Sequence, residues 1–245
     1  MAVLYNPGIV TDGLVLCLDA ANLKSYPGSG VTWSEISNRS NNATLINGAT
    51  FGFYNNGYIR CDGTNDYIEV LDSSSLDFGA NNFTVEYWFR KLQSTSGGYG
   101  NIWGPNKWNL GSAPGTNEWT LGIGDGSSGN TNKYEFSIAA TTNTIYGIQS
   151  SDQLLINTWY QLIGMRDGAN LKLFLNGILK INQNPSGMTA GTAVANVERN
   201  LRINNSQINN LYTNADSAVC RIYNRALSDT EVLQNFNALR GRFGI

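Results

Sequence analysis

The stretch from Trp159 to Lys180 constrains the fold more than any other part of the sequence. Two sets of large side chains each keep one parity there: Trp159, Ile163 and Met165 in the first run, and Leu171, Leu173 and Leu175 in the second. Because successive side chains of a strand point to opposite faces of a sheet, each set can line a core. A helix could not bury this pattern on one stripe.

The same stretch contains two turn signals. Asp167-Gly168 and Asn176-Gly177 stand where the apolar runs are interrupted. Asn, Asp and Gly adopt positive φ at low cost, which suits tight reversals of the chain. The stretch therefore predicts two β-hairpins in succession.

Composition limits the classes of function. The chain has 245 residues, of which 41% are hydrophobic, and a domain of this size needs no disulfides to be stable. Its net charge is −2 and no run of Lys and Arg occurs, which argues against nucleic-acid binding. No segment has the length of apolar residues that would span a bilayer, and the first residues do not resemble a secretory signal.

The three cysteines, Cys17, Cys61 and Cys220, lie in or beside apolar runs. An odd count without an export signal argues against a disulfide framework, so we expect three small buried thiols. Zinc would need a further ligand, and the sequence contains no histidine.

Further apolar runs predict a protein built mainly of strands. Phe83 to Arg90 is the strongest: Phe83, Val85, Tyr87 and Phe89 form a core face, and Thr84, Glu86, Trp88 and Arg90 form a mixed face that we expect to meet solvent or a ligand. We expect further strands at 14–18, 43–45, 58–61, 67–70, 119–123, 134–139, 145–148, 201–203 and 218–223. Residues 33–42 are predicted to form a polar loop, and residues 73–78 one helical turn.

One helix closes the chain. Ser228 and Glu231 form a capping box, and apolar residues from Val232 to Leu239 recur at helical spacing. This predicts a helix over 229–240 that stops at Gly241. No linker divides the sequence, so we expect an N-terminal arm, residues 1–12, followed by one domain, residues 13–245.

The order of several segments resembles one known family. GLVLCLDAAN, RCDGTNDYIEV, FTVEYWF, the hairpin stretch and CRIYNRALSDTEVLQNFNALRGRFGI are similar to the laminin-G-like jelly roll, a branch of the concanavalin A-like lectin/glucanase superfamily, from about Gly13 to Ile245. The resemblance implies an all-β, antiparallel two-sheet jelly-roll sandwich with one concave sheet and a short C-terminal α-helix. Its most specific part, Arg221 to Ile245, is similar to bacteriophage virion proteins.

The residues favour a protein that is not an enzyme. Retaining glycoside hydrolysis needs two carboxyl groups about 5–5.5 Å apart. Glu86 is the only acid of its strand, while Asp66 and Glu69 have opposite parity. Without histidine, Ser/His and Cys/His nucleophiles are excluded. A hydrolase assembled from distant loop acids remains the third alternative.

The family resemblance also raises two kinds of ligand. Laminin-G-like domains often carry calcium in loops, and Asp66, Asp125, Asp152 and Asp216 are loop or loop-edge acids, but none belongs to a motif with fixed ligand spacing, so no metal ligand is assigned. Sugars stack on exposed aromatic rings. The candidate contacts for a glycan or a partner are Trp88, Tyr99, Trp103, Trp108 and Trp119, with burial in the core as the competing interpretation.

We therefore predict a non-enzymatic bacteriophage structural protein. It would decorate the capsid or sit in the tail or fibre, contact other virion proteins or its own copies, need no cofactor, and be assembled in the host cytoplasm. The alternative is a carbohydrate-binding adhesin whose concave face recognises a host surface glycan.

Overall fold

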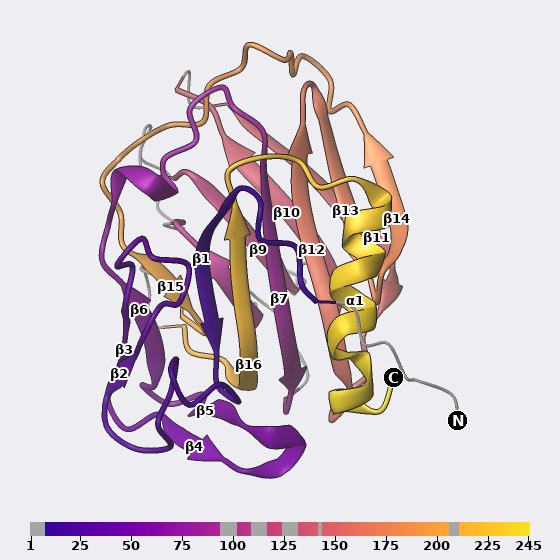
Figure 1. The fold of residues 1–245 in the computed structure, drawn as a ribbon. Coiled ribbons are helices and arrows are strands. Elements are labelled where there is room, and N and C mark those ends of the chain that lie inside the picture. Colours follow the sequence, from indigo (N-terminus) through magenta and orange to yellow (C-terminus); the bar gives the residue numbers. More distant parts are fainter. Residues whose placement is uncertain (1–7, 94–101, 109–116, 124–131, 142–143, 206–210) are drawn as a thin grey trace.

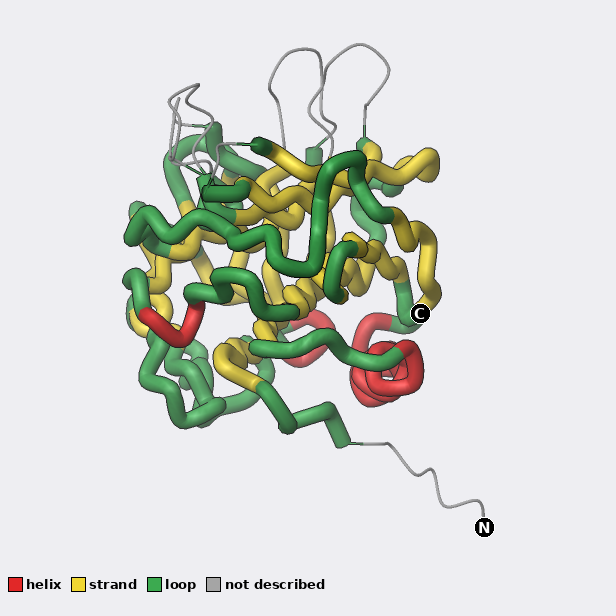
Figure 2. Tube along the Cα trace, turned by 90° about the horizontal axis from the view of Figure 1, so that it is seen from above, coloured by secondary structure: helices red, strands yellow, loops and turns green. Residues whose placement is uncertain are grey.

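The computed structural model describes residues 8–93, 102–108, 117–123, 132–141, 144–205 and 211–245. Within them, two antiparallel sheets pack face to face, and helix α1 (Asp229–Phe243) lies outside the stacked layers (Figures 1 and 2). This arrangement confirms the predicted all-β sandwich with one C-terminal helix. No helix in the described ranges is both long and apolar enough to cross a membrane.

The chain passes several times between the two sheets. The first sheet runs β14 (Ile178–Gln183), β13 (Asn170–Leu175), β12 (Trp159–Asp167), β7 (Phe83–Lys91), β16 (Asn214–Tyr223), β5 (Tyr58–Asp62) and β4 (Thr50–Gly52), and β1 (Leu14–Asp19) also pairs with β16. The second sheet runs β11 (Ile145–Gln153), β10 (Lys133–Ala139), β9 (Trp119–Ile123), β8 (Ile102–Asn106), β15 (Leu201–Ile203), β6 (Tyr67–Val70), β3 (Ala43–Ile46) and β2 (Thr32–Trp33). Two short 3-10 helices, η1 (Tyr54–Asn56) and η2 (Ser74–Leu76), interrupt the loops.

The two predicted hairpins are present as β12–β13 and β13–β14. The second turn is Asn176-Gly177, as predicted, with φ of 52° and 76°. The first turn lies one residue later than predicted, because Asp167 still pairs with Asn170 and the reversal is made by Gly168 and Ala169. Gly168, at φ 62°, is the residue that the left-handed turn requires.

Strand β12 is buried on both faces, since its alternate residues enter different clusters. Leu162 joins the main core between the sheets, together with Leu171 and Leu173 of β13. Ile163 and Met165 point the other way, into a small cluster with Val10 of the N-terminal segment. The parity rule is confirmed, but the cluster lined by Ile163 and Met165 is separate from the core between the sheets.

The mixed face of β7 corrects the sequence prediction. Thr84, Glu86 and Trp88 were expected to meet solvent or a ligand, but each has no exposed surface. Helix α1 covers this face: the Trp88 ring stacks on Phe236 and Phe243 at centroid distances of 5.9 and 4.7 Å. Arg90 alone of the four is partly exposed.

A closed polar cluster lies beneath this helix, and we call it the Glu86 cluster. Oε1 of Glu86 accepts hydrogen bonds from Trp88 Nε1 (2.8 Å), Gln161 Nε2 (2.9 Å) and Arg221 Nη1 (3.1 Å). Oε2 accepts from Nδ2 of Asn235 on α1 at 2.9 Å. The buried carboxylate is therefore fully bonded, and it ties the helix to the sheet.

The capping box of α1 is confirmed, but the helix does not stop at Gly241. The Ser228 side chain accepts from Glu231 N, and the Glu231 side chain accepts from Ser228 N. The helix continues to Phe243, and Gly244 ends it at φ 69°. Phe243 explains the extra turn, because its ring packs 4.7 Å from Trp159 as well as on Trp88.

The three cysteines are free and buried, as expected. Burial raises the pKa of the Cys61 thiol to about 12 and also raises the pKa of Cys17 and Cys220. In the segment that precedes β1, Val10 is buried, and its N–H donates to Asn235 Oδ1 at 2.8 Å.

Candidate functional site

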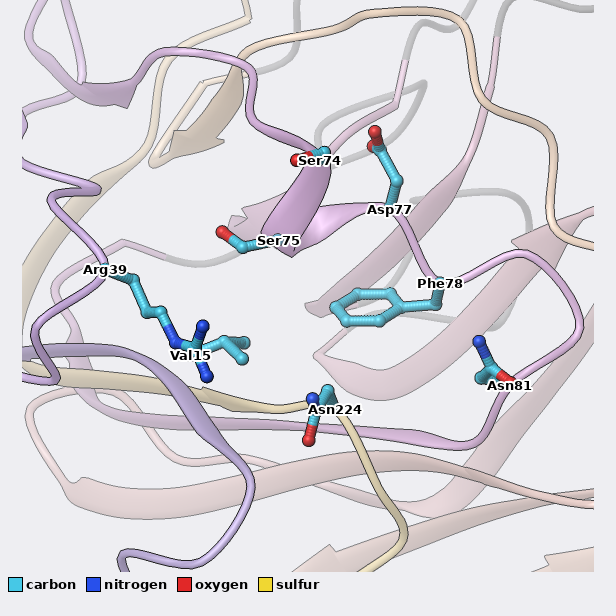
Figure 3. A pocket seen from close by; sticks show the side chains of 8 residues that line it. All are labelled: Val15, Arg39, Ser74, Ser75, Asp77, Phe78, Asn81 and Asn224. Atoms are coloured by element: carbon cyan, nitrogen blue, oxygen red, sulfur yellow. The ribbon is translucent and has the colours of Figure 1, made fainter.

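A polar hollow opens where the loop after β2 meets η2 and the end of β16 (Figure 3). Its volume is about 190 Å³, and the residues that line it are Val15, Arg39, Ser74, Ser75, Asp77, Phe78, Asn81 and Asn224. We call it the Arg39 hollow. A neighbouring depression of about 500 Å³ shares Arg39 and extends along residues 40–44 and 70–73.

The loop that carries Arg39 is held by its own side chains. The Glu35 carboxylate accepts from the backbone N–H of Ser37 and, at 3.0 Å, from that of Arg39. Asn41 is buried and donates through Nδ2 to Val15 O (2.9 Å) and Ser75 Oγ (2.8 Å). The predicted loop is thus an ordered wall fixed to β1 and η2.

The Arg39 guanidinium supplies the positive charge of the hollow. The side chain is exposed, and within the described ranges it makes no hydrogen bond or ion pair. In Figure 3 it extends from the loop toward Val15. An arginine of this kind can form a two-pronged pair with a carboxylate or sulfate of a ligand.

The remaining lining is suited to hydroxyl-rich ligands. Ser74 and Ser75 of η2 supply hydroxyls, and Asn81 and Asn224 supply amides. Phe78 closes the apolar side of the hollow, but its ring belongs to the core and is only 4% exposed, because it stacks on Phe83 at 4.3 Å. Such a mixture of a few fixed polar groups with an aromatic ring is typical of a small-molecule site.

Asp77, which lines the hollow, also joins a buried ionic cluster, which we call the Lys107 cluster. Nζ of Lys107 lies 2.8 Å from Asp72 Oδ1, 2.7 Å from Asp77 Oδ1 and 2.8 Å from Glu118 Oε2. Burial by itself lowers the pKa of Lys107, but the three carboxylates outweigh it and raise that pKa. Lys107 is therefore a permanent cation behind the wall of the hollow.

The acids of this cluster are also the group that could hold a metal ion. Within the described ranges, Asp72, Asp77 and Glu118 are the one set of three acidic side chains whose ligand atoms lie within 4.8 Å of one another. The Lys107 ammonium occupies its centre. None of the four loop acids considered for calcium belongs to this set.

Those four loop acids have other roles or lie elsewhere. Asp216 is buried and pairs with Arg60 and Arg90, at 2.7 and 2.5 Å. Asp152 pairs with Lys180 at 3.2 Å. The Asp66 carboxylate accepts from the N–H of Asp62 at 3.3 Å. Asp125 lies outside the described residues.

The aromatic candidates do not form the predicted exposed platform. Trp88 and Trp119 have no exposed surface and Trp108 has 7%, so these rings are core side chains and cannot stack on a sugar. Tyr99 lies outside the described residues, as does the side chain of Trp103, whose backbone belongs to β8. A contact role for these two stays a prediction.

Within the described ranges, the exposed aromatic rings are ones that the sequence did not single out. Phe53 and Tyr54, between β4 and β5, are 80% and 78% exposed. Arg39 was also missed, because a single arginine in a polar loop carries no pattern. The only signal was the density of Asn and Ser from residue 34 to residue 42.

The structure also bears on the acid considered for catalysis. Glu86 lies under α1 and is paired with Arg221 at 3.1 Å, so it cannot reach a polysaccharide. Asp72 and Asp77, which line the two depressions, are bound to the same ammonium. Neither arrangement supplies a free acid and a nucleophile to one bond.

Comparison with known proteins gives a family match. Residues 62–233 match the model of the concanavalin A-like lectin/glucanases superfamily, which is more than half of the chain. A search of the curated proteins found no match.

Several solved toxin domains share the fold. The binding domain of Paraclostridial Mosquitocidal Protein 1 superposes with a TM-score of 0.71 and 17% identity, over 93% of this chain and 52% of that one. The botulinum neurotoxin serotype D ligand binding domain in complex with N-acetylneuraminic acid gives 0.68 and 14%, over 93% and 51%. The binding domain of botulinum neurotoxin DC in complex with rat synaptotagmin II gives 0.67 and 17%, over 94% and 52%. The chain thus spans about half the length of these domains.

Proposed function

The chain belongs to the concanavalin A-like lectin/glucanases superfamily, and on that premise we propose that it is a non-enzymatic binding module that recognises an acidic surface glycan in the Arg39 hollow. The observation that carries the proposal is the exposed guanidinium of Arg39, which has no ionic partner in the part of the chain that the structure describes, among hydroxyls and amides. This is the adhesin alternative of the sequence analysis with a different site. The proposed glycan contact is now the Arg39 hollow and no longer the tryptophan side chains.

The chemistry of the lining favours a sugar with a carboxylate or a sulfate. Amides and hydroxyls donate and accept at once, which matches the hydroxyl groups of a sugar ring. The guanidinium adds a demand for negative charge, because an arginine that closes on a neutral sugar loses hydration without gaining an ion pair.

The structural neighbours support a binding role. Each of those named above is a binding domain of a toxin, one of them solved with a sugar acid and another with a receptor protein. At this level of identity the likeness concerns the fold. The ligand class proposed here rests on the residues of this chain.

A glycan array with purified protein tests the proposal. Wild-type protein should bind sialylated, uronic or sulfated glycans and leave their neutral counterparts unbound. Arg39→Ala should weaken that binding by about 10- to 100-fold, as expected for the loss of a charged hydrogen-bonding partner. Arg240→Ala is the matched control, since Arg240 is an exposed arginine on α1 away from the hollow.

Two results would contradict the proposal. One is an array on which neutral and acidic glycans bind alike, and the other is an Arg39→Ala variant that binds as wild type does. Binding should also weaken as salt is added, because an exposed guanidinium is screened.

We propose further that the module is carried on a bacteriophage virion, where it contacts other virion proteins or its own copies. The support is the similarity of Arg221 to Ile245 to virion proteins, a segment that forms the end of β16 and α1. Mass spectrometry of purified particles should detect the chain in stoichiometric amounts. Its absence from particles, with the glycan binding intact, would leave a module that works elsewhere.

A further inference from the structure

We infer that Lys107 is a positioning residue that holds the wall of the Arg39 hollow by doing the work of a bound divalent cation. The inference rests on the proposed function only in calling that wall part of a binding site. Three observations carry it: the geometry around Nζ, the charge balance, and the connection from the cluster to the hollow.

The geometry resembles the coordination of an ion. Each of three carboxylates places one oxygen 2.7–2.8 Å from Nζ of Lys107. An ammonium has three N–H donors, so every donor has one acceptor. Calcium binds oxygens at about 2.3–2.6 Å, so two oxygens on one ion lie at most about 5 Å apart, and the acids here satisfy that limit with 4.8 Å.

The charge balance explains why a cation is needed at this place. Lys107 has no exposed surface, and Glu118 is 1% exposed. Without a cation, three carboxylates would be crowded together around a buried position, and they would repel one another or take up protons. The side chain of Lys107 thus supplies a charge that other proteins take from a metal ion.

The cluster is connected to the hollow through Asp72 and Asp77. Asp77 lines the Arg39 hollow and Asp72 lines the neighbouring depression, and η2 lies between the two acids. On the other side, Lys107 and Glu118 are joined through their backbones, because Glu118 N donates to Lys107 O at 3.0 Å. The ammonium therefore fastens η2, with Ser74 and Ser75, to the second sheet.

Replacing the lysine tests the inference, because a structural salt bridge and a cation surrogate predict different results. Lys107→Ser removes the ammonium and leaves space beside three carboxylates. In chelator, this variant should melt at a lower temperature than wild type and bind glycan more weakly. Millimolar calcium should raise its melting temperature by several degrees and restore glycan binding. Wild type should respond to neither calcium nor chelator.

A second variant shows which oxygens hold the ion. Lys107→Ser/Asp77→Asn lacks one carboxylate charge, and its response to calcium should be reduced at least tenfold in affinity. If Lys107→Ser cannot be purified in folded form, refolding in calcium and in chelator replaces the melting experiment. Folded protein should then be recovered in calcium only, and recovery in neither buffer would overturn the inference.

The outcomes separate this inference from the proposed function. A Lys107→Ser variant that ignores calcium overturns the role of Lys107 even when the wild-type protein binds acidic glycans. A calcium response with a blank glycan array supports the role of Lys107 and rejects the glycan. The melting curves require no ligand, so the test can always be decided.

Discussion

Two of the buried ionic clusters, the Glu86 cluster and the Lys107 cluster, differ in what surrounds them. The Glu86 cluster lies under α1, where Glu86 and Arg221 have at most 2% of their side chains exposed. In the Lys107 cluster, Asp72 and Asp77 keep 23% and 17% of their side chains exposed. The first is sealed and matches one carboxylate with one guanidinium and several neutral donors. The second lies at the edge of the sandwich, with three acids around one cation.

The difference indicates what each cluster does. A sealed cluster without a lined depression serves to attach a helix, so its loss should affect stability alone. A cluster whose acids form the wall of a hollow should affect both stability and binding. Four predictions test this contrast, in order of decreasing effect on the free energy of unfolding.

The largest effect is expected for Arg221→Met. This change leaves the Glu86 carboxylate buried without its cation, which should lower the free energy of unfolding by about 3–5 kcal/mol. Urea denaturation measures it. Glu86→Gln/Arg221→Met removes both charges, keeps an amide oxygen as acceptor for Trp88 and Gln161, and should recover part of the loss. A double variant as unstable as the single one would show that the ionic pair itself stabilises the protein.

Lys91 provides a buried cation without carboxylates. Its side chain has no exposed surface, its Nζ donates to Asn132, and burial lowers its pKa to about 8. Since the unfolded state keeps its proton up to about pH 10.5, stability should rise between pH 8 and pH 10.5, by about 1–3 kcal/mol. Denaturation across this range should show the rise in wild type and a flatter curve in Lys91→Met. If wild type and Lys91→Met gave parallel curves of stability against pH, Lys91 would stay charged in the folded state over this range.

The capping box of α1 makes a smaller contribution to stability, which is lost at acid pH. Pairing with Arg225, at 2.6 Å, lowers the pKa of Glu231 to about 2. This contribution is present above the unfolded value near 4.5 and is lost as pH falls toward 2. Glu231→Gln should lower stability at pH 7 by about 1 kcal/mol and leave it unchanged at pH 2. An equal loss of stability at both pH values would show that the loss does not come from the charge of Glu231.

The smallest effect is expected for Arg39→Ala. Because this side chain is exposed and has no ionic partner within the described ranges, its loss should change the free energy of unfolding by less than about 0.5 kcal/mol. Thermal denaturation beside the glycan array measures both properties on one sample. A large loss of stability would place Arg39 with the structural residues and remove it from the binding site.

The elements with strong patterns could be predicted from the sequence, and the short ones could not. Tyr67–Val70, Trp119–Ile123 and Leu201–Ile203 begin and end at the predicted residues. The short strands β2 and β4 were missed because two or three residues hold no detectable alternation, and β8 was missed because Gly104-Pro105 is typical of a turn.

What lies over a strand was harder to predict than the strand itself. The charged face of β7 indicated solvent, yet α1 folds back over it and provides Asn235 for Glu86. The site was missed for the same reason. Arg39, Ser75, Phe78 and Asn224 are far apart in the chain, and only the sheet topology brings them to one hollow. A local sequence pattern carries no information on contacts between residues that are far apart in the chain.

The three buried thiols allow the local opening of the first sheet to be measured. Cys17, Cys61 and Cys220 lie in β1, β5 and β16, neighbouring strands of the first sheet, and their raised pKa values leave little thiolate at neutral pH. An alkylating reagent can therefore modify a chain only during moments when these strands separate. The rate of modification would measure how often the centre of that sheet comes apart, with no dye or engineered label.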